Sequence, residues 1–384
     1  MKVVLAERNR ELMSDLDELM RHVGKTSLPQ ELEPYKSAVV EICKNIQQNV
    51  RINLLKLALP DPTILLQEVT SDTGNALFMV RRMSEILVPA LIQDPYETYL
   101  SLKIVVWLHQ SHPQMKTYPP VVTSGSWGIL PLALPIYYVP LLQQRRLLHQ
   151  PLLFHEFGHQ LYRHHKPEMD QLVEEFQLKV LKLLTPSTGT NDDYYEEQMA
   201  YNQAIAFTWY RWIQELFCDA VGFEIGGPSF LKAFSASLSM IRKGDFHLEQ
   251  EDLIGSSHPV TWLRVHFLTQ RARSVGLVDL AQQINRTWNK VATAFAITED
   301  YYGVYDDVLQ KGILQTLDDM LVEADPIKYQ FGEPQETSMQ SALSPVGLLN
   351  SAWTIYETQP DKYLDWERRM IDQYLNDTMP PLAT

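Results

Sequence analysis

A long stretch without a charged residue, residues 117–144, constrains this chain most, because as a helix it would be long enough to cross a lipid bilayer. Prolines interrupt it at positions 119, 120, 131, 135 and 140. A proline inside a helix costs about 3 kcal/mol, which disfavours a single spanning helix. The remaining residues are rich in β-branched and aromatic types, which favour strands. We therefore expect one or two short strands here and no transmembrane segment.

Helical patterns lie on both sides of this segment. Before it, apolar residues at helical spacing run up to Pro60 and comprise Val39, Ile42, Cys43, Ile46, Val50, Leu54 and Leu57. After it, a second set runs up to Pro326 in steps of four residues, at Leu309, Ile313, Leu317 and Leu321. The predicted fold is mainly α. We expect a helical N-terminal region at 1–115, a core at 116–270 with a small β-sheet, and a helical C-terminal region at 271–384.

Charge and cysteine content exclude several classes of protein. The chain has 33 Lys and Arg against 47 Asp and Glu, a formal net charge of −14. Such an acidic chain is not suited to nucleic acid or to an anionic membrane surface. Its two cysteines, Cys43 and Cys218, cannot form a disulfide framework. The apolar run from Val3 to Ala6 is too short for a secretory signal. We expect a cytoplasmic protein that binds no nucleic acid.

The residues that carry chemistry are His155, Glu156 and His159, an H-E-x-x-H motif in an expected helix after Pro151. On a helix, positions i and i+4 share a face, so both imidazoles can bind one metal ion. Zinc with three protein ligands lowers the pKa of its bound water to about 7, and Glu156 can take the proton and return it. The alternative interpretation is a helix with two unrelated surface histidines.

A zinc site of this type needs a third protein ligand, and two residues are candidates. His165 has the spacing of the extended motif H-E-x-x-H-x-x-G-x-x-H, but Tyr162 stands where that motif has a helix-ending glycine. Glu215 forms an E-x-x-x-D pair with Asp219 on a further expected helix, so the two carboxylates share a face. Glu215 can complete the zinc site, while Asp219 accepts the N–H of a ligand histidine. Without a metal ion, both would be surface acids of an amphipathic helix.

A third segment has the pattern H-P-x-x-x-x-R, from His258 and Pro259 to Arg264. Together, H-E-x-x-H, E-x-x-x-D and H-P-x-x-x-x-R resemble the soluble core of the gluzincin metallopeptidases, in particular the CAAX prenyl endopeptidases and the HtpX-like bacterial peptidases. The run FEIGGPSFLKAF is also similar to one in bacterial H-E-x-x-H proteins. The resemblance covers residues 121–271. It does not extend to the helical flanks, and the transmembrane helices of the family's membrane members have no counterpart in this sequence.

The resemblance implies a zincin-like core and a set of site residues. The implied zinc ligands are His155, His159 and Glu215, with Glu156 as general base and Asp219 orienting a ligand histidine. His258 and Arg264 would be a pair near the substrate oxyanion. Two roles remain open for His258, a donor to the oxyanion or a fourth zinc ligand that keeps the enzyme latent. Arg264 would either pair with an active-site acid or help to bind the oxyanion.

The expected function is that of a zinc-dependent metalloendopeptidase acting on a protein or peptide, with water activated by Glu156. One alternative is a metzincin-like peptidase that uses His165 as its third ligand. The other is a regulatory or interaction protein with a structural or vestigial metal site and an unidentified partner. We also expect Ser124 to Val139 to supply an edge strand at the cleft, where strand addition would bind an extended peptide. Plain hydrophobic core is the other interpretation of that segment.

Overall fold

The computed structural model describes residues 1–61, 63–93, 95–185, 192–238, 244, 246–297, 301–331 and 344–377. These residues are mainly helical and contain one three-stranded sheet, which confirms the expected combination of a mainly helical fold with a small sheet. The chain divides into two compact units. Unit 1 consists of residues 1–110 and 116–144, and unit 2 of residues 111–115 and 145–384.

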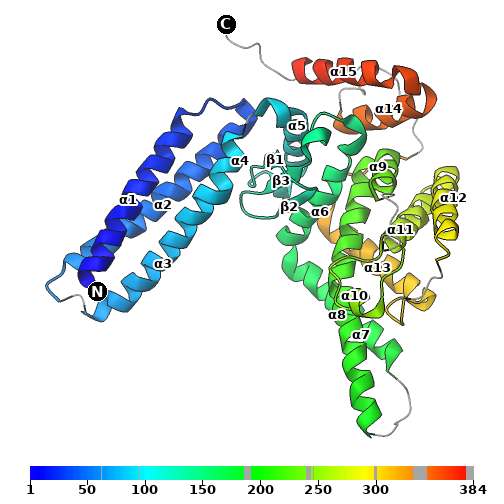
Figure 1. Cartoon of the computed structure of the whole chain (residues 1–384), viewed down its shortest axis with the longest axis horizontal. Coiled ribbons are helices and arrows are strands. Elements are labelled where there is room, and N and C mark those ends of the chain that lie inside the picture. The colour runs from blue at the N-terminus through cyan, green and yellow to red at the C-terminus, as the bar shows by residue number, and fades with distance from the viewer. Residues whose placement is uncertain are drawn as a thin grey trace. The chain divides into compact units, whose positions relative to one another are not determined.

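Three long helices of unit 1 pack against one another, α1 (Lys2–Lys25), α2 (Glu33–Ala58) and α3 (Leu66–Arg82) (Figure 1). Each buries an apolar stripe, and the stripe of α2 includes five of the residues predicted from their spacing: Val39, Cys43, Ile46, Val50 and Leu57. The other helical elements of this unit are the π-helical turn Met83–Leu87, α4 (Val88–Ile92) and α5 (Pro95–Ser111). No helix among the described residues is both long and apolar enough to cross a membrane.

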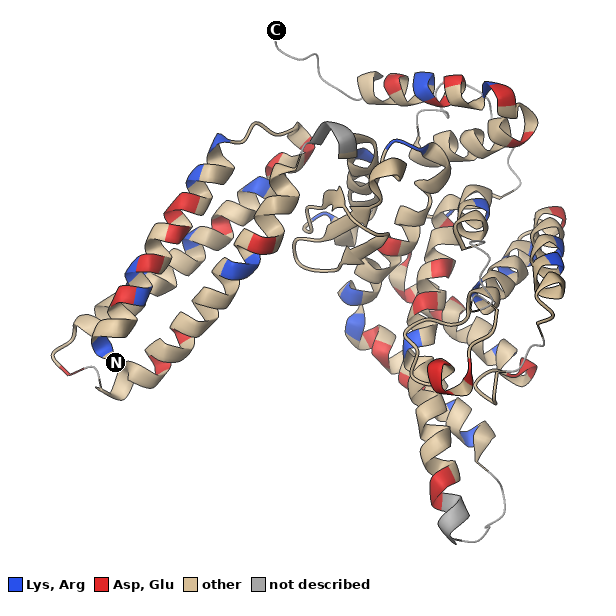
Figure 2. Cartoon of the chain, viewed as in Figure 1, with Lys and Arg blue, Asp and Glu red and all other residues tan. Residues whose placement is uncertain are grey.

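The uncharged segment forms the sheet, as its residue types predict, but with three strands where one or two were expected. Its strands are β1 (Val121–Ser124), β2 (Gly128–Leu130) and β3 (Ile136–Val139), in the spatial order β1-β3-β2. The central strand β3 runs parallel to β1 and antiparallel to β2. In Figure 2 these strands are drawn entirely in tan, whereas charged residues are spread over the helices. The prolines at positions 131 and 135 lie between β2 and β3, outside the strands, where proline removes no hydrogen bond from the ladder.

Both outer strands of the sheet are edges, and they differ in what covers them. The side chain of Gln93 binds along β1: its Oε1 accepts from the backbone N–H of Ser124 at 3.1 Å and from the hydroxyl of Thr123. Strand β2 is half-buried along its length. It lies within the segment expected to supply an edge strand. Because β2 belongs to unit 1 and the H-E-x-x-H motif to unit 2, a position beside the metal ligands stays a prediction.

Unit 2 is organised around the long helix α8 (Asp192–Gly226). The helices that pack against it are α6 (Leu152–His164), α7 (Lys166–Leu184), α9 (Pro228–Leu238), α11 (Thr261–Ser274), α13 (Asp307–Ala324) and α14 (Pro345–Thr358). Further described helices are α10 (Gln250–Leu253), α12 (Val278–Ala294) and α15 (Pro360–Asp377). Four aromatic side chains of α8 are fully buried: Trp209, Trp212, Phe217 and Phe223. Because α8 is apolar on several faces, it serves as the core of the unit.

Glycines allow α6 and α8 to cross at short distance. A Cβ atom on Gly158, within the H-E-x-x-H motif, would lie 2.8 Å from the Cα atom of Cys218 on α8. A Cβ atom on Gly226, two turns farther along α8, would lie 2.8 Å from the ring of Phe154 on α6. Side chains at these positions would push the two backbones apart. The crossing therefore requires a glycine inside the motif itself.

Gly158→Ala should lower the free energy of unfolding by about 1–3 kcal/mol, because its new methyl group meets backbone that cannot move aside. Gly312→Ala, in the middle of α13, is the matched control, since its methyl group would meet only the ring of Phe176 at 3.4 Å. There the better helix propensity of alanine should keep or raise stability by up to about 1 kcal/mol. Urea unfolding of both variants measures the difference, and equal effects would contradict this account of the crossing.

Candidate metal centre

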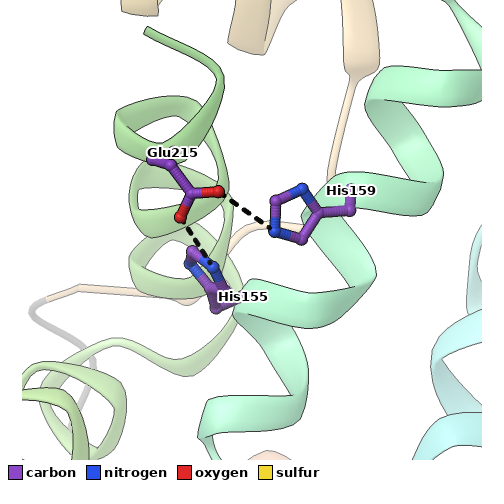
Figure 3. A group of neighbouring side chains, drawn as sticks. All are labelled: His155, His159 and Glu215. Atoms are coloured by element: carbon purple, nitrogen blue, oxygen red, sulfur yellow. Dashed lines mark ion pairs between the residues drawn. The ribbon is translucent and has the colours of Figure 1, made fainter. Parts of the chain in front are cut away.

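Three potential metal ligands from two helices converge in unit 2. His155 and His159 lie one turn apart on α6, and Glu215 faces them from α8 (Figure 3). One Glu215 oxygen is 3.5 Å from Nε2 of His155, and the other is 3.6 Å from Nε2 of His159. Ligand atoms of the three residues all lie within 4.8 Å of one another. Of the two third-ligand candidates predicted from the sequence, the structure brings Glu215 to the histidine pair.

These distances suit a metal ion better than direct hydrogen bonds. A tetrahedral zinc site with metal–ligand distances of about 2.1 Å has ligand atoms about 3.4 Å apart. The Oε2 atom of Glu215 is buried and has no hydrogen-bond partner among the described residues. A buried carboxylate oxygen without a partner is costly, and a metal ion would satisfy it. The residues present therefore fit a bound cation.

The charge balance of the buried residues agrees with this fit. Among the buried side chains around the three ligands are the carboxylates of Glu156, Glu215 and Asp219, and the guanidinium of Arg264. Three negative charges and one positive charge leave an excess of two negative charges if both histidines are neutral. Unpaired charge in a buried site is unfavourable. A divalent cation would balance this set.

Asp219 orients one of the ligand histidines, the role predicted from its position one turn after Glu215. Its Oδ1 atom lies 2.8 Å from Nδ1 of His155. A carboxylate at this distance accepts the Nδ1 proton, so the other ring nitrogen, Nε2, is the one available to a cation on the side of Glu215. Asp219 is 1% exposed, so water does not compete for this bond. The pair therefore fixes both the tautomer and the ring orientation of His155.

Arg264 on α11 binds Asp219 from the other side. Its Nε and Nη2 atoms donate to the two carboxylate oxygens of Asp219 at 2.8 and 2.7 Å, a bidentate pair. Nη2 also lies 3.4 Å from Oε2 of Glu215, and the guanidinium stacks over the ring of Phe234 at 4.9 Å. Arg264 is buried. Of the two roles open from the sequence, this geometry corresponds to pairing with an acid of the site.

Burial and neighbouring charges shift the pKa values of this cluster. Burial raises the pKa of Glu156 to about 6. Burial alone would lower the pKa of His155, but the neighbouring carboxylates of Asp219 and Glu215 outweigh it and raise that pKa to about 10. Burial, together with the nearby His155, lowers the pKa of His159 to about 4. His159 is thus neutral, the form that binds metals, and a cation at Nε2 of His155 would replace a proton there.

His258 lies at the rim of the same cluster. It precedes α11, and its Nε2 atom is 3.5 Å from Oε1 of Glu215, while its side chain is 57% exposed. Its other ring nitrogen, Nδ1, is 2.7 Å from the hydroxyl of Ser257. The structure therefore brings the third sequence segment to the first two. It places His258 within reach of both solvent and the candidate ligands.

His165 belongs to a different part of the surface. It follows the last residue of α6, which stays helical through Tyr162. Its Nδ1 atom is 3.3 Å from Oε1 of Glu323 on α13, and with Glu168 these residues form a second, more exposed group. Among the described residues, no group of neighbouring potential metal ligands combines His165 with His155 and His159. A helix that continues after the motif carries the later histidine away from the first two.

Several residues that shape the candidate metal centre were not predicted from the sequence to belong to it. Phe234 stacks on Arg264, and Cys218 receives the close approach of α6. Trp212 and Ser256 hold the segment that carries His258. Gly158 was visible inside the motif, and a glycine in a helix interior often indicates close packing. The other four are ordinary residues whose roles depend on contacts between distant segments.

Glu215→Ala should abolish stoichiometric zinc binding, whereas His165→Ala should keep it, because only Glu215 faces the histidine pair. The loss of zinc affinity should be larger than about 10–100-fold, which is the usual effect of removing a residue that only contacts a metal ligand. Metal analysis after dialysis measures zinc per chain. In parallel, zinc at 100 times its Kd should raise the stability of the wild type and of His165→Ala by about 2.7 kcal/mol. Zinc retained by Glu215→Ala and lost from His165→Ala would reverse the assignment.

Asp219→Ala should destabilise unit 2 by about 3–5 kcal/mol as well as weaken metal binding, because it removes the bidentate partner of the buried Arg264. The double variant Asp219→Leu/Arg264→Met removes both charges, so it should recover most of the stability while its metal affinity stays low. Thermal or urea unfolding compares the three proteins. If Asp219→Ala unfolds like the wild type, the bidentate pair does not hold the site.

No protein-family model, curated protein or solved structure matches this chain. The resemblance to gluzincin metallopeptidases therefore rests on the three sequence segments.

Proposed function

We propose that this protein is a zinc-dependent metallopeptidase that hydrolyses peptide bonds in a protein or peptide substrate, and that residues 116–270 belong to a zincin-like core. One observation carries the proposal. Two histidines of an H-E-x-x-H helix meet a glutamate from a second helix, and Asp219 binds one of these histidines from behind. The motif also supplies Glu156, an acid that a purely structural metal site does not need.

His155, His159 and Glu215 would hold the zinc ion. Zinc, when bound, supplies a Lewis acid and lowers the pKa of a water molecule to about 7. Three protein ligands leave a position for that water, which is the usual arrangement of catalytic sites. Asp219 and Arg264 keep the first histidine and the glutamate in place, so the ligands need little rearrangement when the ion binds.

Glu156 is the general base of the proposal. It lies in the same helical turn as His155 and is 8% exposed. Because burial raises its pKa to about 6, it can take a proton near neutral pH and return it to the leaving amine. A carboxylate with an ordinary pKa would hold that proton less well. This environment supports a catalytic role over that of a solvated surface acid.

His258 is the proposed donor to the oxyanion that forms when a peptide carbonyl is attacked. Its exposed ring beside Glu215 supports this role, since a donor must reach both the site and the incoming substrate. A latent state, in which the same ring binds the metal, is the alternative. A cytoplasmic location is also part of the proposal, and it rests on two cysteines that are both free and buried.

Glu156→Gln should keep one zinc per chain and lose at least about 100-fold in kcat, the usual contribution of a general base. Casein and a mixed peptide library are suitable substrates, with zinc content measured on the same preparations. Glu168→Gln is the matched control, because Glu168 is exposed and lies beside His165. It should behave like the wild type.

Equal activity of Glu156→Gln and the wild type would contradict the proposed mechanism. A wild type that binds zinc but cleaves none of these substrates would favour the structural or regulatory metal site. Activity lost in Glu168→Gln alone would favour the second group, His165, Glu168 and Glu323, over the proposed site.

A further inference from the structure

The loop that carries His258 is bound to α8 by its backbone. This loop, residues 254–260, connects α10 to α11. The N–H of Gly255 donates to the hydroxyl of Thr208 at 2.7 Å, and the guanidinium of Arg211 donates to the carbonyl of Gly255 at 2.7 Å. Gly255 has a φ of +80°, a left-handed conformation that favours glycine. Both polar groups of one backbone residue are therefore held by side chains of a single helix.

A third connection runs from α8 to the backbone of His258 itself. The indole N–H of Trp212 donates to the hydroxyl of Ser256 at 2.9 Å, and that hydroxyl donates to the carbonyl of His258 at 3.1 Å. Because a hydroxyl has one proton, Ser256 accepts from one side and donates to the other. Trp212 is fully buried, so its N–H would lack a partner if the loop moved away.

The residues that bind the loop share a helix face with the candidate ligand. On α8, Thr208 is followed by Arg211, Trp212 and Glu215 at intervals of three, one and three residues. Asp219 follows one turn after Glu215. The helix that supplies Glu215 thus also fixes the position of the loop that carries His258. Ser257 binds Nδ1 of His258, which leaves Nε2 on the side of Glu215.

We propose that Trp212 and Ser256 are positioning residues that hold His258 beside the metal centre as a fixed donor to the oxyanion. The alternative is a latch, in which His258 is a fourth metal ligand that has to move away before the enzyme becomes active. The inference rests on the proposed function. A latch has to move out, and here the movement would break three connections and leave a buried indole N–H unpaired. A donor has to stay in place, and these connections keep it there.

The two roles predict opposite effects when the loop is loosened. Trp212→Phe removes one hydrogen bond of the Trp212–Ser256–His258 connection, Ser256→Ala removes both, and each variant keeps the candidate ligands. For a fixed donor, kcat should fall about 10–100-fold, since misplacement of about 1 Å has this effect, while KM changes little. Ser256→Thr keeps the hydroxyl and should restore kcat. For a latch, kcat should rise in both variants.

Trp209→Phe is the matched control. Trp209 is also fully buried on α8 and lies edge-on against Trp212 with ring centroids 5.3 Å apart. Its N–H donates to the carbonyl of Val304 at 2.7 Å, outside the His258 loop. The control therefore loses a buried indole hydrogen bond of the same kind. It should leave kcat within about twofold of the wild type, because the loop connections stay intact.

Two measurements do not depend on activity. Hydrogen exchange of residues 254–260 should speed up in Trp212→Phe and Ser256→Ala and stay unchanged in Trp209→Phe. The visible spectrum of the Co²⁺-loaded protein should be the same in the wild type, Trp212→Phe and His258→Ala if His258 is not a metal ligand. A spectrum that changes in His258→Ala would overturn the donor role.

The outcomes separate this inference from the proposed function. A rise in kcat, or an unchanged kcat together with faster exchange of the loop, overturns the positioning role while the peptidase stands. Unchanged exchange in Trp212→Phe overturns the anchoring itself. A wild type without peptidase activity overturns the donor role together with the proposed function, and the exchange measurement still decides whether α8 anchors the loop.

Discussion

The close crossing of α6 and α8 is the contact on which the candidate metal centre depends. Gly158 lies inside the H-E-x-x-H motif and directly against the backbone of Cys218. Because Gly158 places no side chain between the two helices there, residues before and after the crossing face each other. His155 and His159 flank Gly158 on one helix, and Glu215 flanks Cys218 on the other. Helices separated by ordinary side chains would hold these groups farther apart.

Several acids of the site are buried close together near this crossing, and their negative charges have to be balanced. Glu215 and Asp219 are both nearly inaccessible to water, and each needs a partner. Arg264 binds Asp219 with two hydrogen bonds and also approaches Glu215. It does not satisfy both carboxylates, because one oxygen of Glu215 has no hydrogen-bond partner among the described residues. Arg264 thus stabilises part of the site, and the cation we propose would stabilise the rest.

Local patterns in the sequence predicted helices and the segment that forms the sheet. The leucines and isoleucine at positions 309–321 are buried on α13, as their four-residue steps predict. The proline-interrupted segment at 117–144 contains the sheet, because its residue types favour strands and its prolines disfavour a helix. The division into two units was not predicted, since it depends on which distant segments contact one another. That information is absent from the periodicity of any single segment.

By itself, the sequence determined the helices, the short strands and the pair of histidines that share one helical face, because each depends on spacing within a few residues. It left the third ligand open between His165 and Glu215, and the partner of Arg264 open as well. Only the tertiary structure brings one of these candidates to the histidine pair and shows which acid Arg264 binds. The helix α6 continues past Tyr162 and leads His165 toward Glu323, while the glycine crossing brings Glu215 to His155. Such pairings join residues tens of positions apart, so they depend on how helices pack and not on local sequence.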